Sequence, residues 1–134
     1  MKITTPQKIV LITSGLVSML VGIATLFAPD FLHATSGITL DSSASLLNET
    51  RAPGGAILAL SILILSGAFV YRLTLTALLI STILFLSYGM SRLYSMAVDG
   101  LPDKELMQVC VFEILIGLLC LFVLERFLKE PQQS

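Results

Sequence analysis

The sequence predicts an all-α integral membrane protein, an antiparallel four-helix bundle with the N and C termini in the cytoplasm. The 134-residue chain is 55% hydrophobic and 13% charged, whereas about 25% of the residues of a soluble domain are charged. It contains four apolar stretches of the roughly 20 residues that a helix needs to cross a bilayer. Basic residues are unequally divided between the two sides of these stretches. Residues 1–134 are therefore expected to form a single four-span membrane domain.

The first span is expected over residues 9–28. Its basic start resembles a secretory signal peptide, but the apolar run is longer than the usual apolar region of such a peptide. Cleavage after Ala28 would also require a small residue where Leu26 stands, and Pro29 would follow the cleaved bond. This stretch is therefore interpreted as a retained span.

The remaining spans are expected over residues 52–70, 73–96 and 106–124. The second helix is expected to begin outside the membrane, near residue 43, because Asp41, Ser42 and Ser43 are typical of a helix start. It would then continue through Pro53, which favours a kink.

Short connections join the last three spans. Only Tyr71 and Arg72 separate the second span from the third, which predicts a tight antiparallel hairpin. Asp99, Gly100 and Pro102 are turn-forming residues that end the third helix. The third and fourth spans are therefore expected to be neighbours.

The distribution of basic residues predicts the orientation. The side that carries both termini holds five of them: Lys2, Lys8, Arg72, Arg126 and Lys129. The opposite side holds Arg51 and Lys104. This bias predicts a multi-pass cell-membrane protein with both termini in the cytoplasm.

Two charges fall inside the predicted spans. Arg92 precedes the outer end of the third span, and Glu113 follows the outer start of the fourth, so both are expected about 8–10 Å below the outer surface. A charge at this depth is costly and normally has a partner. The two side chains are therefore expected to pair, with Tyr88 close by.

Three further charged residues are expected on the same side. Glu49 and Arg51 precede the second span, and Asp99 follows Arg92 by about two helical turns. The candidate ligand-binding or buried polar cluster thus consists of Arg92, Glu113, Arg51, Glu49 and Asp99. The simpler interpretation makes Glu49 and Arg51 part of a solvated helix start and Asp99 a turn residue.

Small residues recur every four positions in the spans, as in helices that approach one another closely in lipid. Such rows are formed by Ser14, Ser18 and Gly22, and by Ser87, Ser91 and Ser95. In the fourth span, Cys110, Gly117 and Cys120 share the face of Glu113, into which another helix could pack.

The motifs NETRAPGG (residues 48–55) and SRLYSMAVDGLP (residues 91–102), followed by Glu113 in the last span, resemble the domain of unknown function 4345 family. The matching positions are Asn48, Glu49, Arg51, Gly54, Gly55, Arg92, Asp99, Gly100, Pro102 and Glu113. Pro53 stands where that family often has an aromatic residue. The resemblance implies a small four-span protein of the bacterial inner membrane and implies no activity.

Several functional classes lack support in the sequence. It shows no nucleotide-binding loop, metal-ligand cluster or nucleophile–base pair, so no cofactor and no metal is expected. A net charge of −1 gives no basic face for nucleic acid. Cys110 and Cys120 lie about 15 Å apart on one helix, too far for a disulfide, and are expected to be buried apolar side chains. His33 is expected to be solvated in a loop.

Two interpretations of the function stay open. In the first, a non-enzymatic protein binds a small polar or anionic ligand, or a proton, with Arg92 and Arg51 holding the anion and Glu113 as the titratable partner. In the second, the Arg92–Glu113 pair fixes the register of two helices in a structural accessory subunit of a membrane complex. An enzyme is less favoured, since Glu113 alone could only transfer a proton. Besides the lipid bilayer, a homo-oligomer or a larger membrane complex is compatible with four short spans.

Overall fold

The protein is described by a computed structural model that covers residues 2–41 and 43–129. This part of the chain is helical and contains no strand. Its helices are α1 (Thr5–Phe27), α2 (Pro29–Ala34), α3 (Ala44–Gly67), α4 (Tyr71–Asp99) and α5 (Lys104–Lys129). Four of them, α1, α3, α4 and α5, are long and apolar enough to cross a membrane. The expected all-α membrane fold is confirmed, and the chain is a multi-pass membrane protein.

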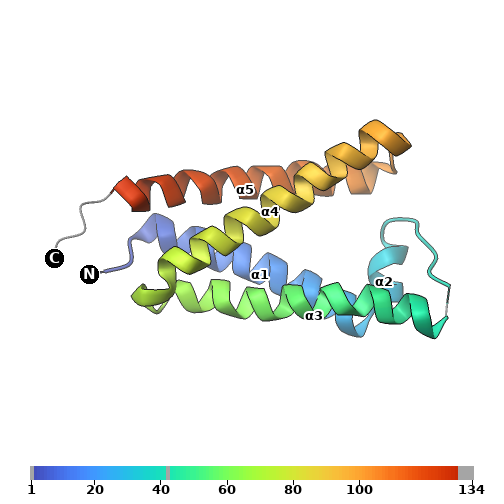
Figure 1. Cartoon of the computed structure of the whole chain (residues 1–134), viewed down its shortest axis with the longest axis horizontal. Coiled ribbons are helices and arrows are strands. Elements are labelled where there is room, and N and C mark those ends of the chain that lie inside the picture. Colours follow the sequence, from blue (N-terminus) through green and yellow to red (C-terminus); the bar gives the residue numbers. More distant parts are fainter. Residues whose placement is uncertain (1, 42, 130–134) are drawn as a thin grey trace.

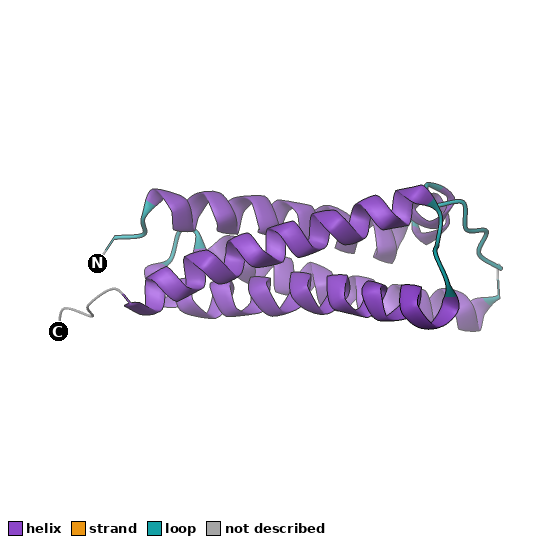
Figure 2. Cartoon of the chain, turned by 90° about the horizontal axis from the view of Figure 1, so that it is seen from above, coloured by secondary structure: helices purple, strands orange, loops and turns teal. Residues whose placement is uncertain are grey.

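The four long helices form two antiparallel pairs. Helix α1 packs mainly against α3, and α4 packs mainly against α5, while α3 and α4 join the two pairs. Figure 1 shows that the pairs lie close together near the chain termini and diverge towards the end that carries α2. In the perpendicular view of Figure 2, the helices follow a common long axis, and the start of α1 and the end of α5 lie at the same end. Both termini are therefore on the same side of the membrane, and which side this is stays a prediction.

The helix starts have local causes. Thr4 and Gln7 form a capping box at α1, in which the Thr4 backbone N donates to Gln7 Oε1 at 2.9 Å. The Ser43 side chain accepts from the Leu46 backbone N at the start of α3, where the sequence favours a helix start. Ser42, which belongs to the same predicted start, lies outside the described residues. Helix α3 continues through Pro53.

The connection between α3 and α4 lies earlier in the chain than expected. Tyr71 and Arg72 already belong to α4, and the turn consists of residues 68–70. The Thr74 hydroxyl donates to the backbone oxygen of Gly67 at 2.9 Å and thereby satisfies a carbonyl at the end of α3. Because this turn is bonded locally, the second and third spans form the tight hairpin that the sequence predicts.

Small residues bring the helices of each pair into close contact. A Cβ atom on Gly22 of α1 would lie 2.7 Å from the backbone N of Leu58, and one on Gly54 of α3 would lie 2.7 Å from the backbone N of Leu26. These distances leave no space for a side chain, so glycine is required for α1 and α3 to approach this closely. In the other pair, a Cβ on Gly117 would lie 2.5 Å from Leu86 Cδ2.

The predicted small-residue rows differ in whether they are buried or exposed. The row Ser14, Ser18 and Gly22 is buried inside the chain. The row Cys110, Gly117 and Cys120 is also buried, and α4 packs on it. The row Ser87, Ser91 and Ser95 is exposed on the outside of α4.

The hydrophobic core is concentrated near the termini. Its larger cluster contains Leu11, Ile64, Leu78, Leu124 and Phe127, which all lie in the halves of the helices that are close to the chain ends. A smaller cluster of Phe85, Ile116 and Cys120 follows towards the middle of the spans. The two pairs diverge towards the end that carries α2. Phe85 of this smaller cluster also lines the pocket described below.

Candidate functional site

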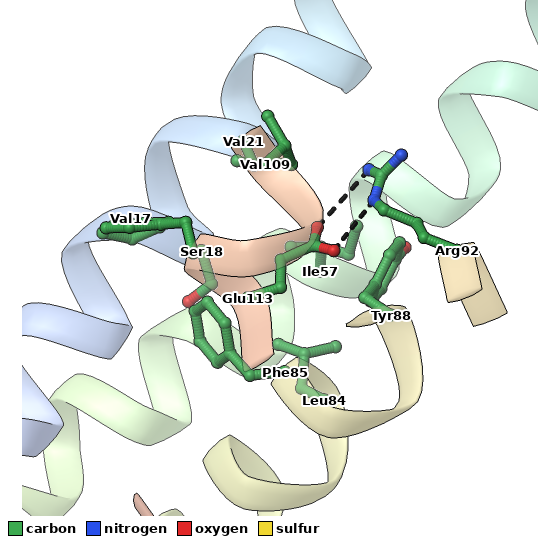
Figure 3. A pocket seen from close by; sticks show the side chains of 11 residues that line it. Val17, Ser18, Val21, Ile57, Leu84, Phe85, Tyr88, Arg92, Val109 and Glu113 are labelled. Atoms are coloured by element: carbon green, nitrogen blue, oxygen red, sulfur yellow. Dashed lines mark hydrogen bonds and ion pairs between the residues drawn. The ribbon is translucent and has the colours of Figure 1, made fainter. Parts of the chain in front are cut away.

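A pocket of about 250 Å³ lies between the two helix pairs, and all four long helices contribute to its wall (Figure 3). Most of its lining side chains are apolar, and Arg92, Glu113, Tyr88 and Ser18 supply the polar groups. The lining residues are Val17, Ser18 and Val21 of α1, Ile57 of α3, Leu84, Phe85, Tyr88 and Arg92 of α4, and Val109, Phe112 and Glu113 of α5.

The pocket exists because small and apolar residues meet where the pairs separate. Ser18 occupies little volume on α1, and its hydroxyl donates to the Ser14 backbone oxygen at 2.8 Å, so it needs no partner in the pocket. Ile57 and Phe85 are buried in the wall. Helix α1 packs much less against α5 than against α3, and side chains of both α1 and α5 line the pocket.

Arg92 and Glu113 form the ion pair that the sequence predicts. Arg92 Nε lies 2.8 Å from Glu113 Oε2, and Arg92 Nη2 lies 3.3 Å from Glu113 Oε1. The contact is therefore bidentate, the geometry in which a guanidinium and a carboxylate match best. The Arg92 side chain is 31% exposed and that of Glu113 is 13% exposed. The pair thus connects α4 and α5 and still borders the pocket.

The pair leaves hydrogen-bonding capacity at the pocket. The guanidinium has further N–H donors beyond the two that contact Glu113. The carboxylate oxygens have lone pairs beyond those used by Arg92. Figure 3 shows the Tyr88 side chain beside Arg92. A polar group that enters here would therefore meet both donors and acceptors, on a pair whose formal charges cancel.

The other predicted site residues lie apart from this pair. Glu49, Arg51 and Asp99 are exposed, and none of them lines the pocket. Within residues 2–41 and 43–129, none of the three forms an ion pair. Asp99 instead accepts a hydrogen bond from the Ser95 hydroxyl at 3.0 Å. The structure thus brings together Arg92 and Glu113 from the five predicted residues.

Helix geometry explains this separation. Asp99 lies about 10 Å along α4 from Arg92, at the end of the helix. Glu49 and Arg51 lie in the first turns of α3, before Gly54, which already meets Leu26 near the end of α1. Because the two pairs diverge at this end, these first turns of α3 are carried away from α4 and α5.

The apolar wall of the pocket was not predicted from the sequence. Val17, Val21, Val109 and Phe112 have the residue types that also face lipid, so their composition does not distinguish a pocket from the membrane surface. Ser18 belongs to a small-residue row, and such a row predicts helix packing and does not indicate a pocket.

Three other side chains with reactive groups, Cys110, Cys120 and His33, are each hydrogen-bonded within the protein. Cys110 and Cys120 are buried free thiols, as expected. Cys120 Sγ lies 3.1 Å from the Ser81 hydroxyl, and Cys110 Sγ lies 3.6 Å from the Gly89 backbone oxygen. The expectation of a solvated loop was wrong for His33, which lies in α2 and is partly buried, with Nδ1 2.8 Å from the backbone oxygen of Pro29. The described residues contain no group of three or more side chains that could hold a metal ion.

Comparison with known proteins gives one match. The sequence model of the family described as "Domain of unknown function (DUF4345)" matches residues 6–124. The chain belongs to this family. The match includes all four long helices except the first residue of α1 and the last residues of α5, and it contains both Arg92 and Glu113. No curated protein and no solved structure matches this member of the DUF4345 family.

Proposed function

We propose that this protein binds a small ligand in the pocket between its two helix pairs, with a polar or anionic group of the ligand against Arg92 and an apolar part between the helices. The observation that supports this proposal is the position of the Arg92–Glu113 pair at the edge of an apolar pocket. Ionisable groups inside a membrane often mark a binding site or pathway. A pair that served packing alone would not need to border a cavity.

The size of the pocket suits a small ligand. An apolar cavity of about 150 Å³ is large enough to bind benzene, and pockets for drug-sized molecules begin at about 300 Å³. The present pocket, of about 250 Å³, lies between these two sizes. The ligand would therefore be a molecule larger than benzene, or the end of a longer molecule.

The orientation of the site is part of the proposal. The basic residues near the chain termini favour cytoplasmic termini. With that orientation, the pocket lies in the outer half of the bacterial inner membrane, because it is at the end of the helices that is remote from the termini.

A second candidate function is a structural subunit of a membrane complex, in which the pair only fixes α4 against α5. The bidentate contact between two neighbouring helices favours it. A subunit of this kind would be expected to present a small-residue seam on its outside. The row Ser14, Ser18 and Gly22 is buried inside the chain and cannot form such a seam, whereas the row Ser87, Ser91 and Ser95 is exposed on the outside of α4 and is available for one.

The proposed function can be tested by ligand-dependent stability. The protein would be reconstituted in lipid nanodiscs, and its thermal unfolding measured with hexanol and with hexanoate. A ligand at 100 times its Kd stabilises by about 2.7 kcal/mol, so at least one of the two probes should raise the Tm of the wild type.

Two variants serve as controls for this measurement. Combining Arg92→Met with Glu113→Leu removes the polar groups, and Val21→Phe narrows the pocket without changing the pair. Both should lose the Tm increase. An equal increase in all three proteins, or none in the wild type, would contradict the proposed function.

A further inference from the structure

We infer that the ligand is an amphiphile of the bilayer itself, a molecule with one alkyl chain and an uncharged hydrogen-bonding head such as a hydroxyl group. This inference rests on the proposed function and specifies its ligand class. It depends on three features of the pocket: the residues that line it, the surroundings that it faces, and the charge of the pair at its edge.

The wall of the pocket suits an alkyl chain. Between the pair and the core, the lining consists of aliphatic and aromatic side chains such as Val17, Ile57 and Phe85. An apolar chain needs no hydrogen bonds, so it can fill this space without leaving a polar atom unpaired. A ligand that is polar throughout would find partners only around Arg92 and Glu113.

The pocket faces the surroundings of the helices. Val21 of α1 is 40% exposed, and Phe112 of α5 is 48% exposed, although both line the pocket. They lie within spans long and apolar enough to cross a membrane, so their surroundings at this depth are lipid. The contact between α1 and α5 is also much smaller than the contacts within each pair. A molecule already in the bilayer therefore has access from the side.

The charge of the pair favours an uncharged head. The formal charges of Arg92 and Glu113 cancel, and the two side chains are already in bidentate contact. An anionic head would add an unbalanced negative charge at membrane depth, where an unpaired charge is costly. A cationic head would add an unbalanced positive charge.

The hydrogen-bonding groups of the pair suit a hydroxyl. The free N–H groups of Arg92 donate, and the Glu113 carboxylate accepts. A hydroxyl group has one donor and two lone pairs, so it can bond to both residues at once. An amphiphile with a hydroxyl head and an alkyl tail thus satisfies both ends of the pocket without changing its net charge.

The test uses decanol that carries a photoreactive diazirine on its chain, added to vesicles that contain the reconstituted protein. After irradiation, the labelled positions are mapped by mass spectrometry of the peptides. We expect labels on α1 and α5 around Val21 and Phe112. Unlabelled decanol should prevent labelling at concentrations at least tenfold lower than those required of decyl phosphate or decyltrimethylammonium.

Two matched variants distinguish labelling inside the pocket from labelling of the lipid-facing surface. Val21→Phe should reduce the labelling at least tenfold. Ile23 lies on the same helix, is 42% exposed in the wild type and does not line the pocket. Ile23→Phe should therefore leave the labelling unchanged. Equal labelling of these two variants would overturn the inference.

The outcomes also distinguish this inference from the proposed function. If decyl phosphate prevents labelling better than decanol, the uncharged head is wrong and the proposed function stands. If hexanol or hexanoate stabilises the protein while the probe labels only outward-facing residues such as Leu119, the ligand does not come from the bilayer and the proposed function again stands. If no soluble probe stabilises the protein and the pocket is not labelled, both fail.

Discussion

Separating Arg92 from Glu113 should reveal whether the pair is needed for folding. Arg92→Met leaves the Glu113 carboxylate, 13% exposed in the wild type, without its bidentate partner. Removing one member of a buried pair costs about 3–5 kcal/mol. Because the Arg92 side chain is 31% exposed, part of the interaction is screened, and we expect a loss of about 2–4 kcal/mol.

Removing the glutamate of the pair should reduce the stability less than removing the arginine. Glu113→Leu leaves a charged Arg92, but this long side chain can direct its guanidinium towards the membrane surface. We expect a loss of about 1–3 kcal/mol. The variant with both changes carries no unpaired charge, so it should lie within about 1 kcal/mol of the wild type, as hydrophobic replacements of buried pairs commonly do.

The assay is unfolding of the four proteins in detergent micelles with increasing sodium dodecyl sulfate, followed by circular dichroism. The double-mutant cycle then gives a coupling free energy, which should exceed about 2 kcal/mol, in the upper part of the usual range for residues in contact. Single variants as stable as the wild type would refute this reasoning, because the pair would then be fully solvated. A double variant that stays strongly destabilised would favour the structural subunit instead.

Three further predictions concern the packing of the helices. Gly54→Ala should destabilise the protein by about 1–3 kcal/mol because its Cβ meets the backbone of α1, whereas Gly55→Ala, with nothing within 4 Å, should be neutral or stabilising by up to about 1 kcal/mol. Thr74→Val should cost about 1–3 kcal/mol by leaving the Gly67 carbonyl without its hydroxyl partner, and the exposed Thr76→Val is its control; chemical unfolding of all four variants measures these differences. The buried thiols of Cys110 and Cys120 should react with maleimide only after unfolding, and fast labelling of the folded protein would contradict their burial.

Much of the fold follows from patterns that the sequence displays directly. A run of apolar residues of membrane-spanning length has one common solution, a helix, so the four long helices were predictable. Arg92 and Glu113 could be paired because they lie at similar distances from a short turn on neighbouring helices. The burial of the Cys110, Gly117 and Cys120 row followed from its small side chains.

The shape between the helices was not predictable in the same way. Burial in lipid and burial in protein select the same apolar side chains, so the sequence did not show that α1 belongs with α3 and α4 with α5. Within the pair of α1 and α3, close contacts occur at single glycines, Gly22 and Gly54, whose partners are known only from the structure. The divergence of the two pairs separates Glu49 and Arg51 from Arg92. The sequence places all three on the same side of the membrane, but this alone does not show whether they are in contact.

The most direct test of ligand binding between the helix pairs is the position of a bound amphiphile. Protein labelled with ¹³C and ¹⁵N would be placed in nanodiscs with decanol, and nuclear Overhauser effects between decanol and side-chain protons measured. Binding in the pocket predicts contacts from the protons next to the hydroxyl to Arg92 and Tyr88, and from the alkyl chain to Val17 and Val21. Contacts confined to outward-facing residues such as Ile83 and Leu119 would contradict it.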